Sequence, residues 1–133
     1  MVLTGGVRTP SDALVGSVAV QTLHSLHLDV VFMGVHGMSE RAGYTTPNLM
    51  EVDTNRAFLG STEHLVVLAD HTKWNVTGLS SIAPLSAATA LITDRHLPAH
   101  ARAVLENEVS TLVLADPQFN EPSNPTALAA GGN

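Results

Sequence analysis

A carboxylate and an ammonium group lie three residues apart, just after an apolar run in this sequence. Residues 65–69 read Leu-Val-Val-Leu-Ala, which is typical of a parallel strand buried on both faces. Ligands of open α/β sheets bind just beyond the carboxyl ends of the strands, and Asp70 and Lys73 follow there. Asp70 can accept hydroxyl hydrogen bonds, and Lys73, the single lysine of the chain, can attract an anion. The pair suits a polyol phosphate; the alternative is a turn cap at Asp70 and a solvated cation at Lys73.

Glycine-rich segments follow two further predicted strands. Residues 2–4 read as the end of a strand that runs into Gly5 and Gly6, and paired glycines allow either a tight turn or close approach to a ligand. Residues 29–34 read as a second buried strand that opens into the loop Gly34-Val35-His36-Gly37. In this loop the imidazole of His36 can donate a hydrogen bond to a ligand oxygen, and backbone N–H groups can bind an anion.

Helical and strand patterns alternate along the chain. Residues 16–28 have the apolar spacing of a helix, and a second helix starts either at Pro47, capped by Thr46, or after Asn48, with Glu51 closing a capping box. This helix is expected to end near Ser61. A third helix is expected over residues 98–108, short strands over 89–94 and 111–116, and an unstructured tail over 117–133. Strands alternating with helices predict an α/β fold with a mostly parallel sheet.

Composition and motifs exclude several functions. Six basic against twelve acidic residues give a net charge of −6, so we expect no nucleic-acid binding by this chain itself. The absence of cysteine favours the cytoplasm, and no apolar segment approaches the length of a membrane span. The pairs His24 with His27 and His96 with His100 each share a helix face, but no carboxylate stands at a metal-site spacing. We therefore expect no metal and no cofactor.

The order of these motifs resembles one protein family. In chain order the pieces are Gly5-Gly6, residues 29–37, Gly43-Tyr44-Thr45-Thr46-Pro47-Asn48, Glu51, residues 68–74, residues 79–85 and Leu91-Ile92-Thr93-Asp94. Together they resemble the C-terminal sensor domain of DeoR-type transcriptional regulators, over nearly everything from Leu3 to about Asp116.

The resemblance implies a Rossmann-like three-layer sandwich, similar in fold to ribose-5-phosphate isomerase and the CoA transferases. Such regulators are typically homo-oligomeric, cytoplasmic repressors of sugar catabolism that a phosphorylated sugar releases from operator DNA. A separate N-terminal winged helix-turn-helix would bind the DNA, and the family's Asp-Ala-Gly-Thr-Thr phosphate loop would lie upstream of Met1. Residues 1–116 are then a partial sensor domain, truncated at the N-terminus, with an incomplete sheet.

Comparison with the isomerases separates a sensor from an enzyme. Enediol chemistry needs a carboxylate base and a positive group for the oxyanion, and such isomerases carry an Asp-Gly-Ala-Asp loop after the strand matching residues 30–33. Here that loop is Gly34-Val35-His36-Gly37, without an acid. Glu51 is followed four positions later by Asn55, with Arg56 beside it, where a basic residue is usual. A non-enzymatic sensor is therefore favoured.

The predicted ligand site centres on Asp70, which accepts hydroxyl hydrogen bonds, and Lys73, which meets the phosphate or a sugar oxygen. The other predicted ligand-binding residues are Gly5, Gly6, Gly34, His36, Gly37, Thr45, Thr46 and Glu51. Two alternatives stay open: an isomerase-like enzyme that acts on sugar phosphates, and a dimerisation module whose pocket is vestigial.

Overall fold

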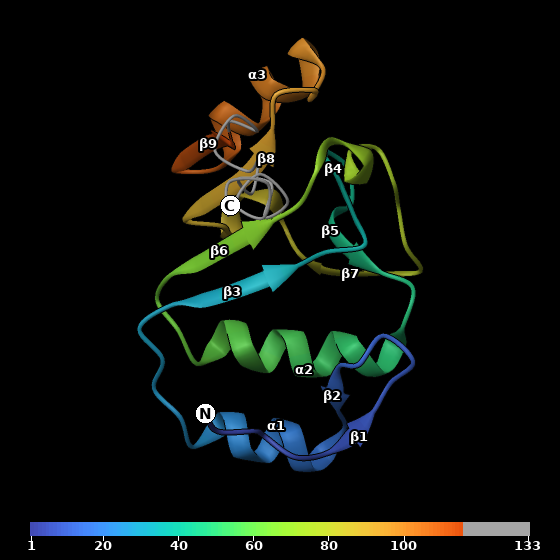
Figure 1. Cartoon of the computed structure of the whole chain (residues 1–133), viewed down its shortest axis with the longest axis vertical. Coiled ribbons are helices and arrows are strands. Elements are labelled where there is room, and N and C mark those ends of the chain that lie inside the picture. Colours follow the sequence, from blue (N-terminus) through green and yellow to red (C-terminus); the bar gives the residue numbers. More distant parts are fainter. Residues whose placement is uncertain (116–133) are drawn as a thin grey trace, which may run out of the picture.

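Four parallel strands form the main sheet of the computed structural model, which describes residues 1–115. Strands β3 (Val31–Gly34), β6 (Leu65–Leu68), β8 (Ala90–Asp94) and β9 (Thr111–Ala115) pair in the order β3-β6-β8-β9 (Figure 1). These four segments are the apolar runs that the sequence predicts as strands, so the mostly parallel sheet is confirmed. Asp116 and the predicted tail at 117–133 lie outside the described residues.

One face of this sheet is buried and the other is open to solvent. Val67 and Leu91 are fully buried on the inner face, whereas on the alternate positions Phe32 is 64% and Leu68 is 44% exposed. The prediction that residues 65–69 are buried on both faces is therefore wrong. The core lies on one side only, and successive side chains of a strand point to opposite faces. The inner face packs against residues from the second sheet and from α3, among them Met38, Tyr44, Ile82, Ala101 and Leu105.

The second sheet is antiparallel and comes from segments in which the sequence predicts no strand. Strands β4 (Gly37–Ser39), β5 (Gly43–Thr46) and β7 (Ser80–Ala83) pair in the order β4-β5-β7. Every residue of β4 and β5 is buried, so these strands carry no alternation of apolar and polar residues to reveal them. Gly43, with φ of +68°, lets the chain reverse between them.

A small hairpin begins the chain in place of the strand expected at residues 2–4. Its strands are β1 (Val7–Arg8) and β2 (Leu14–Val15). Gly5 and Gly6 have φ values of +74° and +109°, and a Cβ on Gly6 would lie 2.4 Å from the carbonyl oxygen of Val15. The paired glycines thus serve the turn and the packing against β2.

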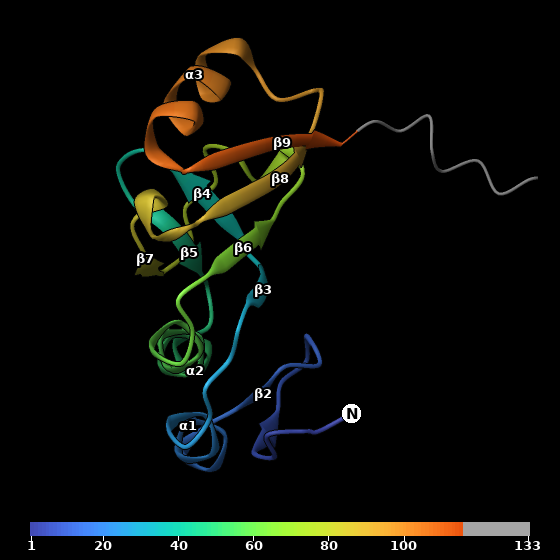
Figure 2. The same ribbon diagram turned by 90° about the vertical axis from the view of Figure 1, so that its left-hand side faces the viewer.

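Three α-helices within residues 1–115 flank the sheets. Helices α1 (Ser17–His24) and α2 (Leu49–Gly60) lie side by side at one end of the molecule, and α3 (Ala99–Glu108) lies at the opposite end (Figures 1 and 2). Helix α1 ends before the expected residue 28, because the N–H of Ser25 turns back to the carbonyl of Thr22. None of the helices within residues 1–115 is long and apolar enough to cross a membrane.

The structure at the start of α2 decides between the two predicted N-caps, Thr46 and Asn48. The Asn48 side chain accepts a hydrogen bond from the N–H of Met50 at 2.9 Å, so Asn48 is the N-cap. The capping box does not form, because the Glu51 carboxylate accepts hydrogen bonds from other side chains. The elements together form an α/β fold with one parallel and two antiparallel sheets rather than a clear three-layer sandwich.

Candidate functional site

Asp70 and Lys73 lie at the carboxyl end of β6, as the sequence predicts. Asp70 caps the short 3₁₀ helix η1 (His71–Lys73), accepting hydrogen bonds at one oxygen from the Thr72 hydroxyl and, at 2.8 Å, from the Thr72 N–H. These two bonds lower the pKa of Asp70, which is exposed and therefore stays ionised at neutral pH. The capping role weighed as the alternative is real, and it leaves a charged carboxylate beside Lys73.

Asp94, at the end of β8, anchors the same turn. Its two oxygens accept hydrogen bonds from the backbone N–H of His71 at 2.6 Å, the Nδ1 of His71 at 2.8 Å and the N–H of His96 at 3.1 Å. Partial burial alone raises the pKa of Asp94, but the N–H groups of His71 and His96 and the His71 imidazole outweigh it, so the pKa lies below its ordinary value. The turn that carries Lys73 is thus tied to two neighbouring strands.

A cavity of about 490 Å³ opens over these carboxyl ends, and we call it the lysine cavity. It is lined by Gly34, Val35, Leu68, Ala69, Asp70, Lys73, Ile92, Thr93, Asp94 and Ala115. One cation and two carboxylates meet there on an apolar floor. Such a place can hold an anionic group next to hydroxyl groups.

A second cavity of about 650 Å³, the glutamate cavity, lies between the β1–β2 hairpin, β3 and the start of α2. Its polar lining comprises Ser11, His36, Thr46, Asn48, Glu51 and Asn55. The Glu51 carboxylate accepts a hydrogen bond from the Ser11 hydroxyl at 2.8 Å and one from the Thr46 hydroxyl at 3.1 Å. This carboxylate therefore already binds hydroxyl groups within the protein.

The two cavities divide the predicted site residues between them. Asp70 and Lys73 line the lysine cavity, and His36, Thr46 and Glu51 line the glutamate cavity. Gly34 and Val35 line both, so the two cavities adjoin at the end of β3.

Four other predicted site residues line neither cavity. Thr45 is fully buried and accepts a hydrogen bond from the N–H of Gly78 at 2.8 Å. Gly37 is buried as well, and Gly5 and Gly6 lie beside β2 and α1. These residues shape the fold around the site.

Sequence reasoning missed two residues of the site. Asp94 was visible as the acid that ends a predicted strand, the same signal that singled out Asp70. Ser11 carried no such signal, because it lies in the loop of the β1–β2 hairpin and stands 40 positions before Glu51 in the sequence. Local windows do not contain such a pairing.

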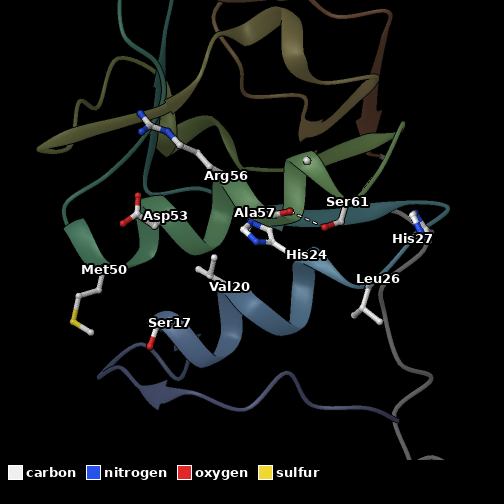
Figure 3. A pocket seen from close by; sticks show the side chains of 12 residues that line it. Ser17, Val20, His24, Leu26, His27, Met50, Asp53, Arg56, Ala57 and Ser61 are labelled. Carbon is white, nitrogen blue, oxygen red and sulfur yellow. Dashed lines mark hydrogen bonds between the residues drawn. The ribbon is translucent and has the colours of Figure 1, made fainter.

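A further hollow, about 850 Å³, is a groove between α1 and α2 that holds none of the predicted site residues (Figure 3). Its charged side chains include Asp53 and Arg56, and the Arg56 guanidinium donates to the carbonyl of Ser81 at 2.9 Å. This groove lies between two helices and away from the carboxyl ends of the parallel strands, so its size alone does not make it the better candidate for the ligand site. Within residues 1–115, no three His, Asp or Glu side chains are grouped so as to hold a metal ion.

Comparison with known proteins identifies the family of this chain. Residues 1–95 match the family described as the DeoR C terminal sensor domain. Relatives include the HTH-type transcriptional regulator GolR of Listeria innocua, 35% identical over 73% of this chain and 39% of its own, and a putative aga operon transcriptional repressor of Escherichia coli O157:H7, 31% identical over 74% and 37%. The glycerol-3-phosphate regulon repressor of Escherichia coli K12 is 24% identical over 79% and 42%.

This chain spans less than half the length of those relatives. Their names describe transcription regulators rather than enzymes, in agreement with the expectation that the chain is not an enzyme. The chain belongs to the family of DeoR C-terminal sensor domains.

Proposed function

We propose that this domain binds a phosphorylated sugar and thereby controls DNA binding by a helix-turn-helix domain elsewhere in the full-length regulator. The observation that carries the proposal is that Lys73, Asp70 and Asp94 all line one cavity at the carboxyl ends of parallel strands. One relative is named for a glycerol-3-phosphate regulon, and a polyol phosphate is the ligand class that this set of charges suits.

Each side chain has a distinct role in this proposal. Lys73 binds the phosphate, since an ammonium group acts as a point charge for phosphate oxygens. Asp70 and Glu51 accept hydrogen bonds from sugar hydroxyls, as Glu51 already does from Ser11. Gly34 and His36 line the glutamate cavity beside Glu51, and Gly34 also lines the lysine cavity. The loop at 34–37 lacks the acids that an isomerase needs, which supports binding without turnover.

The remaining parts of the proposal follow from the family. Residues 1–116 form part of the sensor domain, the intact regulator is a cytoplasmic homo-oligomer, and operator DNA is bound by an N-terminal domain. Two-fold symmetry of such an oligomer would match a palindromic operator. In the intact protein, additional elements would complete a Rossmann-like three-layer sandwich around the parallel sheet.

Titration of the chain with fructose 6-phosphate and sorbitol 6-phosphate, followed by backbone amide chemical shifts, tests the binding. We expect shifts at residues of the lysine cavity, and Lys73→Met to weaken binding by about 1.5–3 kcal/mol, roughly tenfold to hundredfold. Methionine keeps the aliphatic stem and removes only the charge. Arg102→Met is the matched control, because Arg102 pairs with Glu106 on the exposed side of α3. Equal affinity of both variants and the wild type would refute the role of Lys73.

A further inference from the structure

Gly34 stands at the junction of the two cavities. It is the last residue of β3, it pairs in register with Leu68 of β6, and it lines both the lysine cavity and the glutamate cavity. By the alternation of the strand it shares a face with Phe32, the open face of the parallel sheet. A side chain at this position would therefore project from the open face of the sheet, at the residue that both cavities share.

Neither the backbone nor the packing of the protein requires glycine at position 34. Its φ lies outside the left-handed region, and a Cβ placed on it would have no atom within 4 Å. Gly37 is different, because a Cβ there would lie 2.0 Å from the carbonyl oxygen of Val76. Glycine weakens a strand, and a glycine without a structural cause in a strand often marks close approach of a ligand.

We propose that the missing side chain of Gly34 joins the two cavities into one elongated site, and that the effector lies across this residue. The phosphate binds at Lys73 in the lysine cavity, and the distal hydroxyl groups bind Glu51 in the glutamate cavity. The inference rests on the proposed function and adds the length and polarity of the ligand. The ligand is a phosphorylated polyol with its anion at one end and free hydroxyls at the other.

Glu51 is suited to the distal end because its present partners are hydroxyl groups. Ser11, in the loop of the β1–β2 hairpin, and Thr46, at the end of β5, both donate to it. A ligand hydroxyl offers the same donor to the same oxygens, so it can replace Ser11 without leaving the carboxylate unpaired. Inorganic phosphate, by contrast, needs only the lysine cavity.

The test is an amide-shift titration of the 133-residue chain with inorganic phosphate and with sorbitol 6-phosphate. In Gly34→Val we expect the affinity for sorbitol 6-phosphate to fall at least tenfold further than the affinity for inorganic phosphate. Valine suits a strand and meets open space, so the melting temperature should be unchanged or higher. Alanine has a smaller side chain than valine, so the affinity of Gly34→Ala for sorbitol 6-phosphate should lie between those of the wild type and Gly34→Val.

Gly60→Ala is the matched control. A Cβ on Gly60 also meets no atom within 4 Å, but Gly60 lies at the end of α2 and lines neither of the two cavities. It should leave both affinities unchanged. If the wild type binds sorbitol 6-phosphate more tightly than phosphate and Gly34→Val does so equally well, the bridging role fails while the proposed function stands. If the wild type binds neither probe at Lys73, both fail together.

Discussion

Asp94→Asn should loosen the turn that carries Lys73 and destabilise the protein by a calculable amount. The Asp94 carboxylate accepts three hydrogen bonds, two from His71 and one from the N–H of His96. Asparagine keeps one acceptor oxygen and presents an NH₂ group in place of the other, so at least one of these bonds and the negative charge are lost. A hydrogen bond to a charged group contributes about 1.5–3 kcal/mol.

Exposure to solvent reduces the contribution of these hydrogen bonds to stability. The Asp94 side chain is 28% exposed and that of His71 is 40% exposed, which places the expected loss in the free energy of unfolding near 1–2 kcal/mol. Urea denaturation of the chain near pH 7 measures it directly. Glu106→Gln, which removes an exposed partner of Arg102, should cost less than about 0.5 kcal/mol and serves as the control.

The pH dependence adds a second readout with a defined sign. The pKa of Asp94 is lower in the folded protein than in the unfolded chain, so its stabilisation is fully present above about pH 4 and is lost as the pH falls through the folded pKa. The difference in the free energy of unfolding between the wild type and Asp94→Asn should therefore become smaller at acid pH. Equal stability near pH 7, or a difference that persists undiminished near pH 2, would refute the anchoring role.

Four further predictions concern two buried hydroxyl groups, one glycine and the net charge of the chain. Tyr44→Phe should lower stability by about 1 kcal/mol in thermal melts, because the buried Leu85 carbonyl then loses its hydrogen bond from the Tyr44 hydroxyl at 3.2 Å. Thr93→Val should preserve or raise stability in the same melts, since the Thr93 hydroxyl is buried without a partner among residues 1–115. Gly37→Ala should cost about 1–3 kcal/mol in urea denaturation, because its Cβ would meet the Val76 carbonyl. The chain alone, with a net charge of −6, should give no sequence-specific shift of operator DNA in a gel at physiological salt, and a specific shift would contradict the placement of DNA binding in another domain.

Local sequence determined the parallel half of this fold. The apolar runs that became β3, β6, β8 and β9 are continuous. The Asn48 cap of α2 and Pro98 just before α3 stand next to residues with helical spacing, so windows of a few residues suffice to find these elements. The same local logic placed Asp70 and Lys73 at a strand end. The carboxyl ends of parallel strands lie at one edge of the sheet, so the sequence alone also indicates that Asp70 and Lys73 lie near Asp94.

Tertiary structure alone decided the other half of the site. Strands β4 and β5 are buried throughout and carry Ser39, Thr45 and Thr46, so their sequence pattern does not indicate strands, and only the pairing of β5 with β4 and β7 reveals the sheet. The contact of Ser11 with Glu51 needs the hairpin and α2 to be docked first. Pairing between distant segments depends on which surfaces the whole chain buries together, and that free energy belongs to no single stretch of sequence.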